Sequence, residues 1–488
     1  MRQGAEFSGN DPEHIGDMQN MVKPINEREL VLGILMEVTE KGQYSHIVLR
    51  EVLGKYQYLD KKERAFITRV TEGTLEHMIE LDYILDQFSK VKVKKMKSVI
   101  RNILRSAVYQ LKYMDTVPDS AVCNEAVKLA VKKGFAGLRG FVNGVLRTTA
   151  AGLNGVAYPK DPTELLSVQY SMPRWILELW LKSYDRQTVE TMLREFQKEK
   201  PLMIRGRIGQ EPDLQKTGIR EKAGSGCVPA EAESLCRELE SEGIHVTPHP
   251  YLSYAFYISG QDYLGRLKSF QEGRFSVQDA SSMLVCEAAA PRTGDTVIDV
   301  CAAPGGKAVH MAEMLRGTGS VEARDLTAYK VGLIQENIDR SGLTNIRAAQ
   351  MDARVVDAAS VGKADIVIAD LPCSGLGVLG KKTDLKYKTT KESISSLVEL
   401  QREILSVVKT YVRPGGILMY STCTINPAEN MDNVHWFLEQ NPEFSMKDIR
   451  ENLCEELRED VKEQGCLQLL PGIHKSDGFF LACMRKER

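Results

Sequence analysis

The chain has 488 residues, of which 43% are hydrophobic and 27% charged, and its formal net charge is −2. This length exceeds what one hydrophobic core usually serves, so two or three domains are expected. No apolar run approaches the roughly 20 residues that cross a bilayer, and the first residues lack the basic-then-apolar order of a signal peptide. These features argue against a membrane protein, and we expect a cytoplasmic one.

The ten cysteines show no C-x-x-C pair and no Cys/His cluster at zinc-binding spacing. A disulfide framework is not expected in a chain of this size and compartment, and neither is a metal site. Most of these thiols should therefore be small core residues. A cysteine with a chemical role has to be recognised from its local motif.

The first third of the chain is predicted to be helical. Residues 1–24 are polar and aperiodic, which indicates a flexible extension, whereas residues 25–150 carry apolar side chains at helical spacing and form an all-α domain. Within it, the segment 90–147 has thirteen Lys or Arg and three acidic residues, a local excess of +10. Such a surface suits a polyanion, although a lysine-rich, solvated helical face would give the same pattern.

The middle of the chain predicts a linker and a small mixed module. Residues 151–170 contain Gly, Asn and two prolines, as linkers do. Residues 171–275 form a small α+β module, with a helical stretch up to Gln197, strands at 202–208 and 254–258, and a helix at 231–242. A glycine-containing loop insertion lies near Gly224.

Residues 276–488 alternate apolar β-type runs with helical stretches, which predicts a Rossmann-like domain with a mostly parallel sheet covered on both faces. The closing run at 479–483 is a candidate antiparallel edge strand. The fold class is therefore multidomain α plus α/β. The expected parallel strands span 296–300, 320–323, 345–348, 364–369 and 416–420, with helices at 327–341 and 393–412 between them.

Polar and reactive residues follow these strands. In such sheets, ligands bind at the carboxyl ends of the strands, near the point where strand order reverses. The first strand leads into a Gly-Gly turn, in itself a weak signal, that opens the next helix. The later strands end in acids or lead into cysteines. The residues concerned are Gly305-Gly306, Asp325, Asp352, Asp370, Cys373 and Cys423.

These motifs resemble the RNA cytosine-5 methyltransferase family over nearly the whole chain. The family's cofactor loop corresponds to Cys301–Lys307, its P-C motif to Pro372-Cys373 and its T-C motif to Thr422-Cys423. The amino-terminal part is similar to the helical domain of the NusB antitermination factor. Further matching segments are Tyr109–Leu111, Asn124–Val127, Gly140–Arg147, Val277–Ser282 and His474–Phe480.

The resemblance implies S-adenosylmethionine as methyl donor and cytosine C5 of 16S ribosomal RNA as acceptor, at the family's cytosine 967, in a monomer without metal. RNA would contact the helical domain, including the segment 90–147, and the small α+β module. Cofactor contacts are implied for Cys301, Ala302, Ala303, Pro304, Gly305, Gly306, Lys307, Asp325, Lys330, Asp352 and Asp370. The three acids, taken alone, could merely cap helices, and a packing role suits Cys301 better than chemistry.

Two cysteines suit this reaction because cytosine C5 is a poor nucleophile until a thiolate adds to C6. By resemblance Cys423 is the attacking thiolate and Cys373 assists product release. We further expect Asp370 to hydrogen-bond near the reacting base or the cofactor, and Lys307 to lower the pKa of the thiolate.

Several positions around the motifs leave two interpretations open. His474 is either structural or RNA-facing, and Lys386 and Tyr387 either contact RNA or belong to a solvated loop. Where the family usually has Asp-Ala-Pro-Cys, Leu371 precedes Pro372-Cys373 here. Where the family often has Arg-Arg and Pro, this chain has Gly380-Lys381 and Thr383, so weaker bidentate phosphate contact is expected.

Three alternative functions compete. A DNA cytosine-5 methyltransferase would use Cys373 as its nucleophile, and Glu429-Asn430 superficially matches a later motif of those enzymes. The same chemistry could act on transfer RNA or 23S ribosomal RNA. A non-catalytic RNA-binding or antitermination protein is disfavoured because both cysteines and the Gly-Gly turn are present.

Overall fold

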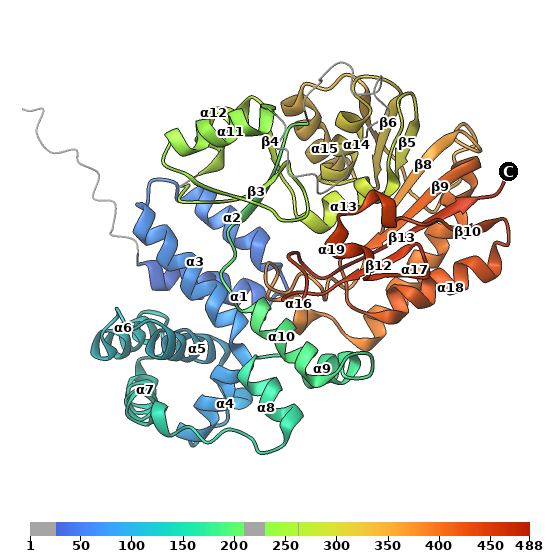
Figure 1. Cartoon of the computed structure of the whole chain (residues 1–488). Coiled ribbons are helices and arrows are strands. Elements are labelled where there is room, and N and C mark those ends of the chain that lie inside the picture. The colour runs from blue at the N-terminus through green and yellow to red at the C-terminus, as the bar shows by residue number, and fades with distance from the viewer. Residues whose placement is uncertain (1–25, 209–229, 262) are drawn as a thin grey trace, which may run out of the picture.

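The computed structural model describes residues 26–208, 230–261 and 263–488. The predicted extension 1–24 and the insertion near Gly224 lie outside these ranges. The mixed class predicted from the sequence is confirmed: a helical domain, a small antiparallel sheet module and a carboxyl-terminal domain with a mostly parallel sheet follow one another along the chain (Figure 1). In the described ranges, no helix has the length and apolar character needed to cross a membrane.

The helical domain has its own apolar core, centred on α5, whose residues from Ile100 to Gln110 are almost all buried. Helix α3 begins with a capping box between Asp60 and Glu63, whereas α2 has no capping side chain from its own segment. The helices are α1 (Glu27–Thr39), α2 (Ser45–Lys55), α3 (Lys61–Glu76), α4 (Met78–Phe88), α5 (Ser98–Tyr113), α6 (Asp119–Lys132) and α7 (Arg139–Gly152).

Three helices bridge this domain to the rest of the protein: α8 (Pro162–Gln169), α9 (Arg174–Trp180) and α10 (Arg186–Phe196). They share an apolar core with residues such as Leu376 and Ile425 of the carboxyl-terminal domain. Trp180 Nε1 donates to the Ile425 carbonyl at 3.0 Å. Helix α8 thus lies within the segment expected to be a linker, and α9 and α10 pack on the carboxyl-terminal domain.

The small module is a four-stranded sheet of order β2-β3-β1-β4 covered by α11. Met203 and Tyr254 extend its core into that of the carboxyl-terminal domain, so the two units form one packed body. Its elements are β1 (Leu202–Gly206), α11 (Ala230–Ser241), β2 (His245–Pro248), β3 (Ala255–Ser259), α12 (Lys268–Gln271) and β4 (Phe275–Val277).

The carboxyl-terminal sheet has the order β11-β12-β13-β9-β8-β5-β6-β7, with β10 also paired to β13. Strands β5 to β9 are parallel, and the strand order reverses between β5 and β8. Its elements are α13 (Ala280–Ala289), β5 (Thr296–Asp299), α14 (Gly306–Met314), β6 (Ser320–Asp325), α15 (Ala328–Ser341), β7 (Ile346–Gln350), β8 (Ala364–Asp370), α16 (Leu385–Lys388), α17 (Lys391–Val408), β9 (Val412–Thr422), α18 (Met431–Gln440), β10 (Phe444–Met446), α19 (Glu455–Arg458), β11 (Val461–Lys462), β12 (Cys466–Leu469) and β13 (Phe479–Lys486).

The expected edge strand is antiparallel as predicted, but its position was wrong. Strand β13 pairs with β9 on one side and with β12 on the other, so it is an interior strand. The hairpin of β11 and β12 supplies the edge instead. Its strands are two and four residues long, too short for the apolar alternation that reveals a strand.

Candidate active site

The parallel pairing of β8 and β9 brings the two motif cysteines together. Asp370 at the end of β8 is in register with Ser421 near the end of β9. Cys373 and Cys423 follow these strand ends, and their Sγ atoms lie 3.3 Å apart. Both residues are only half-buried. Cys423 also packs against the edge of the apolar core.

The two thiols have opposite pKa shifts. The hydrogen bond with Cys373 lowers the pKa of Cys423, and the positive charges of Lys382 and Lys307 act in the same direction, against burial and the negative charge of Asp370. The same hydrogen bond, together with burial, raises the pKa of Cys373 well above its ordinary value. These directions make Cys423 the more acidic thiol of the pair.

A buried carboxylate holds the loop that carries Cys373. Glu429 is fully buried, and its two oxygens accept from the Ser374 backbone N–H (2.8 Å), the Ser374 hydroxyl (2.5 Å), Asn426 Nδ2 (2.8 Å) and Gln401 Nε2 (3.2 Å). With four donors around it, this carboxylate has a structural role. The likeness of Glu429-Asn430 to a DNA-enzyme motif is therefore superficial.

Lys307 and Asp370 form an ion pair beside the cysteines. Lys307 Nζ lies 2.7 Å from Asp370 Oδ2, and the Ser421 hydroxyl donates to Asp370 Oδ1 at 2.8 Å. Burial opposes the charged form of Lys307, but the Asp370 carboxylate outweighs it and raises the pKa of Lys307. Both groups are thus charged, and each has a fixed orientation next to the sulfur atoms.

The cofactor loop of the sequence motif folds back on the end of β6. Gly305 has φ 108°, in the left-handed region, and a Cβ there would lie 3.5 Å from the Ile334 Cα in α15. Asp325 Oδ2 accepts from the Ala303 backbone N–H at 3.1 Å, and Lys330 Nζ lies 3.0 Å from Asp325 Oδ1. The residues named for cofactor contact from Cys301 to Lys330 therefore meet at one place.

Asp299 was not among the predicted cofactor residues, although it opens the motif at the end of β5. It is buried, its two carboxylate oxygens have no hydrogen-bond partner among the described residues, and burial raises its pKa to about 7. A buried acceptor without a donor is costly unless a ligand supplies one. The α-ammonium group of S-adenosylmethionine is such a donor, so the loop fits this cofactor.

The structure gives less support to a cofactor contact at Asp352 and Cys301 than at the other predicted residues. Asp352 lies two residues beyond β7 and pairs with Arg354 at 2.7 Å, and its side chain is partly exposed. Cys301 packs against the core, and burial together with nearby carboxylates raises the pKa of its thiol, which agrees with a packing role.

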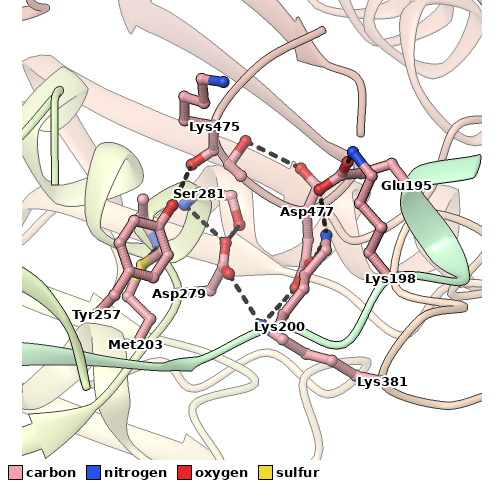
Figure 2. Close-up of polar contacts among 12 residues, drawn as sticks. Glu195, Lys198, Lys200, Met203, Tyr257, Asp279, Ser281, Lys381, Lys475 and Asp477 are labelled. Carbon is pink, nitrogen blue, oxygen red and sulfur yellow. Dashed lines mark hydrogen bonds and ion pairs between the residues drawn. The ribbon is translucent and has the colours of Figure 1, made fainter. Parts of the chain in front are cut away.

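A cluster of charges replaces the expected phosphate contact at Lys381. Its ammonium group lies 2.9 Å from Asp279 Oδ2 and 2.6 Å from Asp477 Oδ2, and Lys200 approaches Asp477 from the other side (Figure 2). The next residue, Gly478, donates to the Gly377 carbonyl, while Gly377 donates to the Cys423 carbonyl. Lys381 thus braces the wall of the cysteine site, with its charge already paired to two carboxylates.

The expectations for Lys386 and Tyr387 were also wrong, because neither faces RNA or solvent. Lys386 Nζ donates to the Glu76 carbonyl at 2.7 Å, and burial lowers its pKa to about 8. Tyr387 is half-buried against the same carbonyl and that of Ser171. His474 is buried, and its Nδ1 accepts from the Leu470 backbone N–H at 2.8 Å, so of its two expected roles the structural one holds.

The segment 90–147 has less unpaired positive charge than its composition suggested. Six of its cations pair with acids outside the segment, for example Arg105 with Asp82 at 2.5 Å, and Lys128 pairs with Glu125 inside it. The six are Lys92, Arg101, Arg105, Lys112, Lys132 and Lys133. In the part of the chain that the structure describes, no ion pair involves Lys90, Lys94, Lys95, Lys97, Arg139 or Arg147, and these remain as predicted RNA contacts.

The fold and the site define a methyltransferase of the Rossmann-like class, with a paired-cysteine centre and an added helical domain. Two family models match the chain: "16S rRNA methyltransferase RsmB/F" over residues 286–485 and "NusB family" over residues 25–151. A probable ribosomal RNA small subunit methyltransferase B of Bacillus subtilis is 34% identical over 469 residues, covering 96% of this chain and all of its own. The chain belongs to the 16S rRNA methyltransferase RsmB/F family.

Other relatives extend over the same length. A Synechocystis protein with the same description is 30% identical, and the match covers 95% of this chain and the whole of that protein. Among solved structures, that of PH0851 has a TM-score of 0.75 at 23% identity over 95% of this chain and 99% of its own. NSun6 from Pyrococcus horikoshii with SFG has a TM-score of 0.50 at 21% identity over 68% of this chain and 99% of its own. These structures support the fold.

Proposed function

We propose that this protein methylates C5 of a cytosine in 16S ribosomal RNA through a covalent bond between Cys423 Sγ and C6 of the base. The observation that carries the proposal is the 3.3 Å contact between the sulfur atoms of two cysteines that follow adjacent strand ends. The choice of ribosomal RNA rests on the relatives, which carry the name of a small subunit RNA methyltransferase.

S-adenosylmethionine supplies the methyl group as a sulfonium. The residues proposed to hold it are Asp299 for the ammonium group, Asp325 and Lys330 beside the ribose, the loop Cys301–Lys307, and Asp352 at the rim. NSun6 from Pyrococcus horikoshii, which shares this fold, was solved with SFG, an analogue of this donor.

The two cysteines would act in sequence. The Cys423 thiolate forms a bond to C6, which gives C5 the electron density to accept the methyl group. Once Cys423 is bonded to carbon, it no longer carries the charge that keeps Cys373 protonated. Cys373 then loses its proton to solvent and removes the C5 proton. The S–C6 bond then breaks, which releases 5-methylcytosine and regenerates the Cys423 thiolate.

Asp370 would select the base. One of its oxygens is bound by Lys307 and the other by Ser421, yet each retains a lone pair. A carboxylate in this position accepts from the exocyclic amine of cytosine, which uracil lacks. The enclosed Glu429 gives no support to the DNA-type alternative, in which that residue would face the base.

Trapping with RNA that contains 5-fluorocytosine tests the assignment, because fluorine at C5 cannot be removed as a proton. Wild type should form a covalent protein–RNA adduct that is stable in denaturant. Cys423→Ala should form none, while Cys373→Ala and the control Cys123→Ala should still form it. Adduct loss in Cys373→Ala alone would reverse the roles, and no calorimetric binding of S-adenosylmethionine would argue for a non-catalytic protein.

The position and the class of RNA need a separate experiment. Mapping 5-methylcytosine in RNA from cells with and without this protein should show the loss of one mark in 16S ribosomal RNA. A mark lost from transfer RNA or 23S ribosomal RNA instead would move the proposal to that substrate.

A further inference from the structure

Helix α2 of the helical domain contacts the carboxyl-terminal domain at two separate places. At its first residue, the Ser45 backbone N–H and hydroxyl donate to the Asp384 carboxylate at 3.1 and 2.6 Å. Five residues later, Arg50 Nη2 donates to the Tyr329 hydroxyl at 3.2 Å. Asp384 belongs to the segment after β8, and Tyr329 follows β6.

These two contacts tie α2 to both parts of the site. Asp384 lies on the segment that begins beside the cysteines, where the Gly377 N–H donates to the Cys423 carbonyl. Tyr329 lies in the first turn of α15, next to Lys330, which pairs with Asp325 at the cofactor loop. The first half of α2 is therefore attached both to the segment that leads from the cysteines and to the helix beside the cofactor loop. Figure 1 shows α2 on the side of its domain that faces this sheet, with α6 and α7 on the far side.

This half of α2 exposes an arginine and a histidine. His46 and Arg50 are exposed and four residues apart, so they lie on the same side of the helix. Burial and the charge of Lys382 lower the pKa of His46, so His46 can act as a hydrogen-bond donor but not as a cation near neutral pH. The exposed Lys382 lies on the segment that runs from Gly377, whose N–H donates to the Cys423 carbonyl, to Asp384, which binds the start of α2. The backbone of Lys382 is fixed by a bond from its N–H to the Val378 carbonyl at 3.0 Å.

Exposed aromatic rings stand beside these cations. Tyr44, at the start of α2, is 45% exposed, and Tyr329 is 65% exposed. Cations that meet phosphates, together with free aromatic rings that stack on bases, are typical of surfaces that bind single-stranded nucleic acid. The target base has to leave its stack to reach Cys423, so the strand around it must be held open.

We propose that Arg50 of α2, together with Lys382, binds the phosphates that flank the target cytosine, with His46 as an additional hydrogen-bond donor, and that α2 thereby sets which RNA strand enters the site. This inference rests on the proposed function, because it needs an RNA substrate at Cys423. It assigns the contact nearest the chemistry to α2, whereas the segment 90–147 can serve only more distant parts of the RNA.

The test is steady-state methyl transfer to naked 16S ribosomal RNA by the full-length protein at saturating S-adenosylmethionine. Arg50→Ala should raise the KM for RNA about fivefold with little change in kcat, because it removes a contact to substrate and none to the reacting atoms. In filter binding, the slope of log affinity against log salt should fall by about 0.7, the value for one phosphate contact on a single strand. Arg50→Lys should keep the slope.

Two controls separate RNA contact from domain docking. Tyr329→Phe removes the hydrogen bond to Arg50 but keeps the ring, so it should behave as wild type if Arg50 binds RNA, and as Arg50→Ala if Arg50 only docks the domain. Arg292→Ala removes an exposed arginine that precedes β5, at the opposite end of the sheet, and should change neither KM nor slope.

Equal KM values and salt slopes for Arg50→Ala and Arg292→Ala would overturn the inference, provided that wild type methylates the RNA. If wild type transfers no methyl group and forms no adduct with 5-fluorocytosine RNA, the proposed function fails and this inference fails with it. If Tyr329→Phe reproduces Arg50→Ala, α2 is a docking element alone.

Discussion

Substitution of Glu429 should destabilise the protein by an amount that its four hydrogen bonds determine. In Glu429→Ala, two of the four donors keep another partner: the Ser374 hydroxyl lies 2.8 Å from Thr424 Oγ1, and Gln401 Nε2 already donates to the Pro372 carbonyl at 2.8 Å. The Ser374 backbone N–H and Asn426 Nδ2 lose the one acceptor that they have among the described residues. Each buried donor left unpaired costs about 1–3 kcal/mol. The expected loss is therefore about 4 kcal/mol.

Glu429→Gln should cost about half as much, roughly 2 kcal/mol. Its amide oxygen can keep the bond from the Ser374 N–H, and its NH₂ can donate to the Ser374 hydroxyl, but it repels Asn426 Nδ2. Calorimetric unfolding of the full-length protein should rank wild type above Glu429→Gln and Glu429→Gln above Glu429→Ala. Glu439→Ala, an exposed glutamate on α18, is the matched control and should unfold like wild type.

The outcome also separates two roles for Glu429. If it faced the base, Glu429→Ala would lose activity and keep its stability. An unfolding free energy within about 1 kcal/mol of wild type would refute the structural role, and so would equal losses for the Ala and Gln variants. A shift of the Cys373 loop should also lower kcat, because the contact between the two sulfur atoms depends on it.

Three further outcomes are expected. Lys381→Met leaves the Asp279 and Asp477 carboxylates facing each other, and it should lower the free energy of unfolding by about 2 kcal/mol, a figure discounted for the partial exposure of Lys381. Lys381→Arg should lower it less. Equal thermal unfolding of Lys381→Met and wild type would contradict this. The pKa of Asp299 is raised from 3.8 to about 7, so between these pH values the folded state holds a proton that the unfolded state releases. The free energy of unfolding should therefore fall as pH rises from about 4 to 7, by up to about 4 kcal/mol. Asp299→Asn should abolish this part of the pH dependence, and parallel stability curves for the variant and wild type would refute it. Asp384→Ala removes the cap of α2 and should cost about 1 kcal/mol, with faster hydrogen exchange at the Ser45 amide, and unchanged exchange would show that the contact is not formed in solution.

The parallel strands and the residues at their ends could be predicted from the sequence because both depend on local pattern. The runs before Asp370 and Cys423 contain the apolar stretches 366–369 and 417–420, which are typical of buried parallel strands, and the fold places their ends together. The pairing partner of β13 was not predictable in this way, since it depends on a hairpin formed by strands of two and four residues.

The surroundings of the motif could not be predicted because they are made by contacts between distant segments. Lys381 and Lys386 look alike in the sequence, as lysines in a polar loop. One is held by two carboxylates from separate segments, and the other is buried under the carbonyl end of α3. Asp299 carried a usable signal, a carboxylate at the end of the first strand, but its lack of a partner is visible only in the structure.

The caps that the carboxyl-terminal domain supplies to α2 and α3 have a consequence for biosynthesis. Ser45 and Asp384 are 339 residues apart, and Glu76 and Lys386 are 310 apart. At about 5–20 residues per second, a ribosome needs roughly 15–70 s to make the second partner after the first. During that interval, the Ser45 N–H at the start of α2 and the Glu76 carbonyl at the end of α3 can form these hydrogen bonds only with water. The helical domain can fold early, but its contacts with the segment 384–386 form only near the end of translation.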